Sequence, residues 1–273
     1  MEFDKRSSAF PSKRDALIEI YSGIDLVRRS YMEWKIGCSG YHYPDWKGIF
    51  YPEDIPQRKW FEYYCQHFNT LELNLTYYKL PRPENLRTWY SRSPKGFSFT
   101  VKAPRDITNF KKFTDAQRML YDFNHFIGDG LGEKLGCVLF QFPRNFQFEP
   151  DRLARITDML DASVRNVVEF RHESWWNKAV YTTLKKHRII FSGMSHPALP
   201  DAVVSTVDTL YYRFHGVPHL YNSKYDSRKL EQVAQELLAQ RQGREAFIYF
   251  NNTADACAVT NAKQLQEICE LVH

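Results

Sequence analysis

The sequence predicts an α/β protein with the fold of a (β/α)8 TIM barrel. Apolar runs of strand length alternate with amphipathic stretches of helix length from residue 35 onward, which is typical of a parallel sheet covered by helices. There are eight such runs, and that number favours closure into a barrel over an open sheet. A chain of 273 residues is long enough for one barrel of this kind. We therefore expect a single barrel domain over residues 34–273.

The eight strand candidates are short, near-continuous apolar runs, as expected for strands that are buried on both faces. They cover residues 35–39, 70–74, 97–102, 136–141, 166–170, 188–192, 209–214 and 246–250. Helical periodicity follows in most of the gaps, over residues 57–67, 84–92, 115–127, 151–160, 175–187, 228–240 and 255–271. The gap after the sixth strand is short and poor in helical signal.

Residues 1–33 precede the first strand candidate and are expected to form an N-terminal extension. Ser12 with Asp15 three residues later can cap an amphipathic helix. Apolar residues continue to Val27, although Gly23 weakens the helical pattern. We expect this helical extension to pack outside the barrel.

Composition restricts the cellular setting and the partners. The net charge of +5 permits a phosphate-bearing partner without requiring one. The five cysteines form neither a CxxC pair nor a disulfide framework, so reduced thiols are expected. No apolar run approaches the roughly 20 residues that cross a bilayer, and the N-terminus has no secretory signal. The expectation is a cytoplasmic protein without a membrane partner; no protein partner can be inferred.

Polar residues gather at the carboxyl ends of the predicted strands, the face on which TIM barrels carry their sites. These residues are Ser39, Gly40, Glu72, Asn74, Lys102, Gln141, Glu169, Arg171, His172, Arg213, His215, Asn251 and Asn252. Period-two alternation puts Glu72 and Asn74 on one side of their strand, and the same holds for Glu169 with Arg171. Glu169 and Arg171 either satisfy each other inside the fold or line a site, and the sequence leaves both readings open.

Aromatic residues surround the same predicted face. Tyr41, Tyr43 and Trp46 follow the first strand, and Trp175 follows the fifth. Flat rings beside charged groups suit stacking on a base or a sugar face. The alternative is a loop lid whose rings pack against each other.

Several motifs occur in an order that resembles a known family. They are IGCSGYHYPDWKGIFYP, LELNLTYYKLP, GFSFTVKAPRDIT, LGCVLFQFP, VVEFRHESWW, YYRFHG and YFNNTADACAVTNA. Together they resemble the domain-of-unknown-function 72 family, also called YecE-like. The resemblance implies a TIM barrel and no established activity or cofactor. Departures from the family pattern are Tyr41, where members often carry Trp, the positions near Leu75 and Thr76, and the N-terminal extension.

Two hydrolytic functions are possible alternatives. A glycosidase needs two carboxyl groups about 5 to 9.5 Å apart, and Glu72 and Glu169 are the obvious pair, although the second and fifth strands are far apart around the ring. A metal-assisted phosphoesterase would draw on His172, His215, the two glutamates and Asp255, but the sequence has no HxH or HExxH motif. We expect no metal site, and a structural hydrogen bond to a carboxylate is the favoured role of His215.

Binding of a phosphate-containing ligand, either a nucleotide or single-stranded nucleic acid, has more support. TIM barrels often hold phosphate in the loops after strands seven and eight, where His215, Asn251 and Asn252 precede a helix starting near Asp255. The loop after the third strand adds cations: Lys102, Arg105, Lys111 and Lys112. The two asparagines could instead form a turn that caps the last helix.

The predicted site therefore has two groups of residues, and whether it catalyses a reaction remains open. The candidate catalytic residues are Glu72, Glu169, Arg171 and His215. The candidate ligand-binding residues are Tyr41, Tyr43, Trp46, Asn74, Lys102, Gln141, His172, Trp175, Arg213, Asn251, Asn252 and Asp255.

Overall fold

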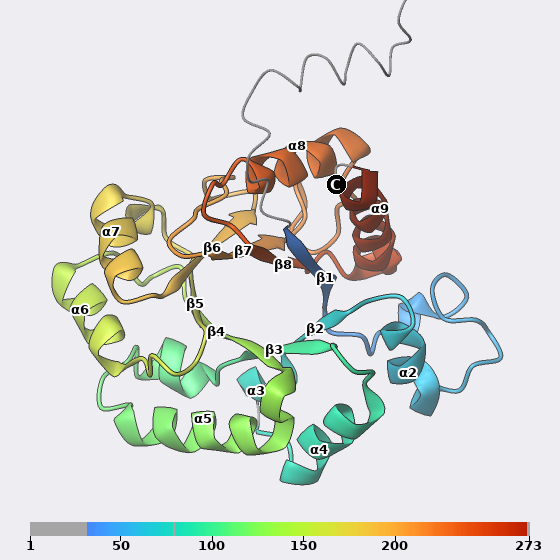
Figure 1. Cartoon of the computed structure of the whole chain (residues 1–273), viewed down its shortest axis with the longest axis horizontal. Coiled ribbons are helices and arrows are strands. Elements are labelled where there is room, and N and C mark those ends of the chain that lie inside the picture. Colours follow the sequence, from blue (N-terminus) through green and yellow to red (C-terminus); the bar gives the residue numbers. More distant parts are fainter. Residues whose placement is uncertain (1–31, 79, 272–273) are drawn as a thin grey trace, which may run out of the picture. The chain divides into compact units, whose positions relative to one another are not determined.

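Eight parallel strands close into a barrel in sequence order, from β1 beside β2 round to β8 beside β1 (Figure 1). A computed structural model describes residues 32–78 and 80–271. The predicted (β/α)8 barrel is therefore confirmed. The helix expected within residues 1–33 lies outside the described residues.

The strands lie close to the predicted runs. They are β1 Glu33–Ser39, β2 Thr70–Leu73, β3 Ser98–Lys102, β4 Leu135–Phe142, β5 Asn166–Phe170, β6 Ile190–Ser195, β7 Thr209–Phe214 and β8 Glu245–Phe250. The largest difference is at β6, which begins two residues later and ends three residues later than expected. Arg188 adopts a positive φ of 56° and belongs to the turn before the strand, which explains the later start.

Helices surround the barrel in Figure 1. They are α2 Trp60–Cys65, α3 Leu75–Tyr78, α4 Pro83–Arg92, α5 Gln117–Leu131, α6 Pro150–Met159, α7 Lys178–Lys186, α8 Ser227–Leu238 and α9 Cys257–Leu271. Segment 196–208, between β6 and β7, contains no helix, as its weak helical signal predicted. The helix expected from residue 175 begins later, because Asn177 caps α7 by accepting a hydrogen bond from the Val180 N–H at 3.0 Å.

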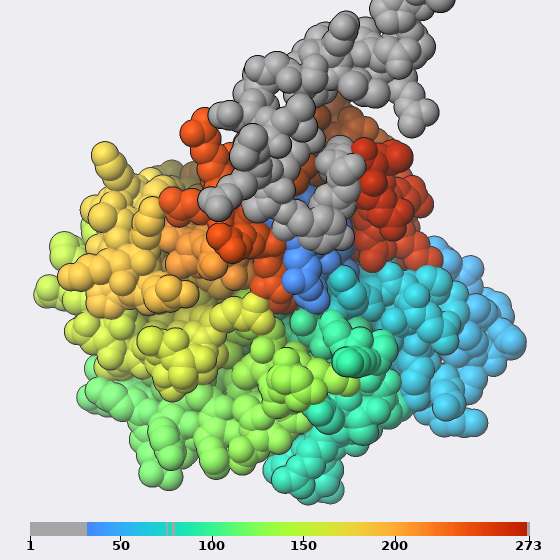
Figure 2. All heavy atoms as spheres, viewed as in Figure 1, coloured from blue at the N-terminus to red at the C-terminus, as the bar shows by residue number. Residues whose placement is uncertain are grey.

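Two hydrophobic clusters follow from the alternation of side chains along the strands. The larger cluster lies between the strands and the helices, whereas the smaller one fills the barrel interior with Cys137, Leu139, Val167, Ile190, Tyr211, Phe247 and Tyr249. Figure 2 shows that atoms of the chain occupy the space that the ribbon leaves open at the barrel axis. The interior is thus a packed core, as in other TIM barrels.

The register of the strands places polar side chains above this apolar floor. Ser39 lies beside Glu72 across β1 and β2, and Gln141 lies beside Glu169 across β4 and β5. Arg213 is two residues after the interior-facing Tyr211, so it points inward one layer closer to the carboxyl ends. The polar layer therefore lies at the carboxyl face, as predicted.

All five cysteines are free, as expected for reduced thiols. Across the described ranges, every helix is too short or too polar to cross a membrane.

Candidate functional site at the carboxyl face

One guanidinium joins two buried carboxylates at the centre of the carboxyl face. Arg213 Nη2 donates to Glu72 Oε1 at 2.6 Å, and Arg213 Nη1 donates to Glu169 Oε2 at 2.8 Å. The side chain of Arg213 is 1% exposed and both glutamates are fully buried. Strands β2 and β5 are separated by two strands in the barrel, as expected, but an inward-facing arginine on β7 reaches both carboxylates.

Glu72 has further hydrogen-bond donors that make its burial possible. Ser39 Oγ donates to Oε1 at 2.7 Å, and Tyr211 Oη donates to Oε2 at 2.7 Å. A buried charge is costly unless it is paired and bonded, and here both oxygens are satisfied. Glu72 is therefore held in place by residues from β1 and β7.

Glu169 is bound by a second guanidinium and an imidazole. Arg171 Nε donates to Oε1 at 2.6 Å, and His215 Nε2 lies 3.3 Å from Oε2. Burial alone would raise the pKa of Glu169, but the charges of Arg171 and Arg213 outweigh it and hold the pKa well below its usual range. Glu169 is thus a fixed anion. Of the two open readings of the Glu169–Arg171 pair, the first is confirmed, because the two residues satisfy each other inside the fold. That the pair lines a site stays a prediction.

His215 is neutral in this setting. Burial and the nearby Arg171 charge hold its pKa well below the usual range. Asn251 Nδ2 lies 3.0 Å from Nδ1, which makes Nδ1 the acceptor and leaves the proton on Nε2, facing Glu169. The expected hydrogen bond between His215 and a carboxylate is confirmed.

Lys102, at the end of β3, is buried beside neutral groups. Its Nζ donates to Gln141 Oε1 at 2.8 Å and lies 4.0 Å from the centre of the Tyr77 ring. The residue is 9% exposed, and no described carboxylate lies within ion-pair distance. Burial and then the charge of Arg213 lower the pKa of Lys102 to about 7, against the opposing pull of the two glutamates.

The expected role of Trp46 and Trp175 as open stacking surfaces is wrong. Both side chains are fully buried. Trp175 stacks on Phe170 with ring centres 3.8 Å apart and donates to the Phe146 carbonyl at 2.7 Å. Trp46 donates to the Thr253 carbonyl at 2.8 Å and so joins the loops after β1 and β8. Their indoles hold loops in place and present no face to a ligand.

Three other predicted ligand-binding residues make local structural contacts. His172 Nδ1 accepts from the Ser174 N–H at 3.2 Å and caps a short 3-10 helix. Asn252 is fully buried and donates to Asn261 Oδ1 at 3.0 Å. The Asp255 N–H donates to Asp45 Oδ2 at 3.1 Å, while α9 itself begins at Cys257. Neither predicted asparagine caps that helix through its side chain.

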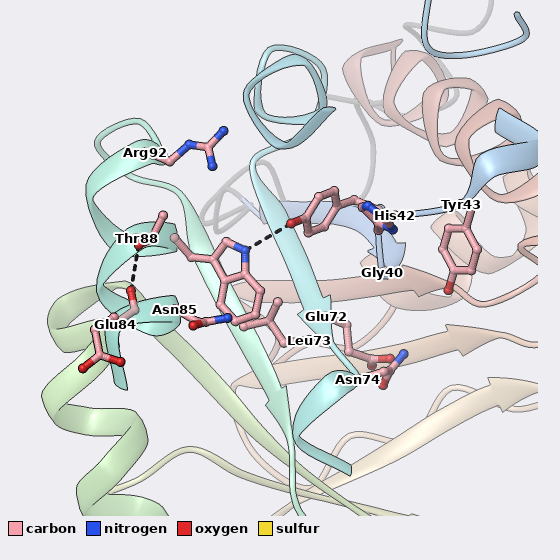
Figure 3. A pocket seen from close by; sticks show the side chains of 12 residues that line it. Gly40, His42, Tyr43, Glu72, Leu73, Asn74, Glu84, Asn85, Thr88 and Arg92 are labelled. Atoms are coloured by element: carbon pink, nitrogen blue, oxygen red, sulfur yellow. Dashed lines mark hydrogen bonds between the residues drawn. The ribbon is translucent and has the colours of Figure 1, made fainter. Parts of the chain in front are cut away.

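A cleft of about 690 Å³ opens beside the cluster, between the loop after β1, the end of β2 and helix α4 (Figure 3). Tyr41, Tyr43, Glu72 and Asn74 were predicted at this site and line the cleft. The residues that α4 contributes were not predicted; they are Glu84, Asn85, Thr88, Trp89 and Arg92. Their positions look like the ordinary polar surface and buried face of an amphipathic helix.

The residues considered for a metal-assisted phosphoesterase do not form a metal-binding group. Over residues 32–78 and 80–271, no group of three or more His, Cys, Asp or Glu side chains is placed to hold a metal ion.

These features define a TIM-barrel protein with a buried charged cluster at the carboxyl face and a cleft beside it. A family model described as "Protein of unknown function DUF72" matches residues 35–273, and the chain therefore belongs to the DUF72 family. This confirms the resemblance seen in the motifs.

Related proteins agree with this assignment. The UPF0759 protein YunF of Bacillus subtilis is 27% identical over 271 residues, covering 86% of this chain and 94% of YunF. The UPF0759 protein YecE of Escherichia coli is 29% identical over 118 residues, 43% of each chain. A crystal structure of a DUF72 family protein from Thermotoga maritima superposes with a TM-score of 0.79 at 28% identity, covering 87% of this chain and 99% of that one.

Proposed function

We propose that the protein binds a phosphate-containing ligand at the carboxyl face, with Lys102 and Arg171 as its cationic contacts. The observation that carries this proposal is an imbalance of charge. Three cations, Lys102, Arg171 and Arg213, lie around two carboxylates, and both carboxylates are already bound by guanidinium groups. With Lys102 protonated, the cluster has one positive charge more than its own anions balance.

Lys102 is the group with most to gain from an anion. A buried ammonium is unfavourable unless a negative charge compensates it, and its hydrogen-bond acceptor here is the neutral Gln141 amide. A phosphate oxygen would supply the missing charge in a setting where screening by solvent is weak. Arg171, whose side chain is 10% exposed and whose charge acts on Lys102, offers a second cationic contact at the same face.

The alternative hydrolytic function has less support. A glycosidase acid must carry a proton and so needs a raised pKa, whereas the pKa of Glu169 is lowered by two arginines. Glu72 accepts hydrogen bonds at both oxygens, one of them from the same guanidinium. Carboxylates held this firmly suit positioning of cations better than proton transfer.

A small ligand is favoured over a nucleic-acid strand. Stacking on single-stranded bases requires open ring faces. Of the four rings expected to supply them, Trp46 and Trp175 are fully buried, and only Tyr41 and Tyr43 line the cleft. The cleft volume of about 690 Å³ lies within the usual range of small-molecule pockets.

Calorimetric titration with inorganic phosphate tests the proposal. We expect Lys102→Met to weaken binding by roughly 10- to 100-fold, because a charged hydrogen bond contributes about 1.5–3 kcal/mol. Lys35→Met is the matched control, since Lys35 is also 9% exposed but lies at the opposite end of its strand, paired with Glu33. Absence of phosphate binding in the wild-type protein, or equal losses in the two variants, would contradict the proposal.

A further inference from the structure

Two side-chain amides line the cleft beside the charged cluster without being used by the fold. Asn74 follows β2 and Asn85 lies on α4 (Figure 3). Neither side chain makes a hydrogen bond to another described residue, and Asn74 Oδ1 is buried without a partner. Each amide offers two donors and one acceptor oxygen. The cleft therefore presents hydrogen-bonding capacity on two opposing elements.

Two further polar residues of α4 at the cleft, Thr88 and Arg92, are already engaged. The Thr88 hydroxyl donates to the Glu84 carbonyl at 2.7 Å, which leaves its oxygen lone pairs as acceptors. Arg92 Nε donates to Glu62 at 2.8 Å. Apart from the exposed carboxylate of Glu84, the cleft therefore adds mainly neutral donors and acceptors to the charge of the neighbouring cluster.

The aromatic wall of the cleft is apolar but offers little free ring face. Trp89 is 7% exposed, and its Nε1 donates to Tyr41 Oη at 3.2 Å, the dashed contact in Figure 3. The Tyr41 ring packs against Phe61 at 5.3 Å and meets His42 edge-on at 6.1 Å. Tyr41 and Trp89 therefore leave little ring face on which a nucleobase could stack. A sugar ring has apolar C–H groups with hydroxyls around its edge, so it matches a wall of this kind flanked by amides.

The cleft reaches the charged cluster at Glu72, which lines the cleft and binds Arg213. We infer that the ligand is a sugar phosphate, with its hydroxyls bound by Asn74 and Asn85 and its phosphate by Lys102 and Arg171. This inference rests on the proposed phosphate binding and specifies the chemistry of the rest of the ligand.

Calorimetry with a panel of probes tests the inference. The probes are inorganic phosphate, glucose 6-phosphate, glucosamine 6-phosphate, ribose 5-phosphate and adenosine 5′-monophosphate. At least one of the three sugar phosphates should bind tenfold or more tightly than inorganic phosphate, and more tightly than the adenosine nucleotide. Asn74→Ala and Asn85→Ala should remove this gain while leaving the affinity for inorganic phosphate unchanged.

Arg87→Ala is the control, because Arg87 is exposed on α4 but does not line the cleft. Asn85 is exposed, so its substitution tests the cleft even if Asn74→Ala fails to fold. The inference is overturned if inorganic phosphate binds but no sugar phosphate binds more tightly, or if the nucleotide gains most. Failure of inorganic phosphate to bind would instead overturn the proposed function on which it rests.

Discussion

Two groups of buried charge at the carboxyl face are satisfied in opposite ways. Around Arg213, every charged partner is internal, because Glu72 and Glu169 lie within 2.6–2.8 Å of its guanidinium nitrogens. Around Lys102, the partners are an amide oxygen and an aromatic ring. The two groups are buried to a similar degree, yet only Arg213 has carboxylate partners that balance its charge. Burial alone therefore does not distinguish a structural charge from one that a ligand can neutralise.

The largest expected effect comes from removing the Arg213 guanidinium, which binds Glu72 and Glu169. Arg213→Met leaves two carboxylates without a charge they share, so we expect a loss of about 3–5 kcal/mol in the free energy of unfolding. Arg165→Met is the control, because Arg165 pairs with Glu245 at the surface and such pairs contribute about 0–1 kcal/mol. Urea unfolding measures both. A cost for Arg213→Met as small as that of the control would show that the group is not a structural unit.

An effect of the opposite sign is expected at Lys102. Its pKa of about 7 lies below the ordinary 10.5, so the unfolded chain holds one more proton between these two values. This residue therefore makes stability rise with pH from about 7 to 10.5, by up to about 1.4 kcal/mol per pH unit, and the gain is lost as the pH falls toward 7.

Lys102→Met should remove this dependence and be relatively most stabilising at pH 7 and below. Chemical denaturation of wild type, Lys102→Met and Lys35→Met at several pH values provides the measurement. If the free energy of unfolding changes with pH in the same way in wild type and Lys102→Met, Lys102 does not differ from Arg213 as described.

The smallest effect on the site is expected from the exposed cations outside both groups. Lys111→Ala with Lys112→Ala should leave the affinity for inorganic phosphate unchanged. If the protein retains weak binding to single-stranded oligonucleotides, this double variant should flatten the log–log salt dependence by about 1.4, or roughly 0.7 per lost phosphate contact. Fluorescence anisotropy across a salt series checks this. Loss of inorganic phosphate binding in the double variant would place the anion site in that loop and not at Lys102.

The fold and the polar face were predictable because they depend on chain order and on period-two alternation. The inward direction of Glu72, Glu169 and Arg213 follows from their positions on the strands. Their meeting did not follow, because strands two, five and seven converge only once the barrel closes and a long arginine side chain spans the interior. The nearby sequence thus predicts where these residues lie on their strands, but it does not predict which residues they contact.

Aromatic residues and helix residues account for the remaining differences. Trp175 stands beside charged residues in the sequence, yet it packs inward on Phe170, because neighbours in sequence do not decide the direction of a loop side chain. Asn85 and Trp89 belong to the cleft only because α4 lies next to the end of β2. Helical periodicity predicts helix α4 itself, but it does not predict that α4 packs next to the end of β2.

The central claim is that Lys102 is a buried amine whose positive charge is balanced by an anion bound from solution. NMR titration of the Lys102 side chain, assigned by the signal missing in Lys102→Met, tests it directly. Sulfate is the suitable anion, because its charge stays constant over the titration. The account predicts a pKa of about 7 without sulfate and a higher pKa with it. An ordinary pKa near 10.5 without sulfate, or a low pKa that sulfate does not raise, would contradict it.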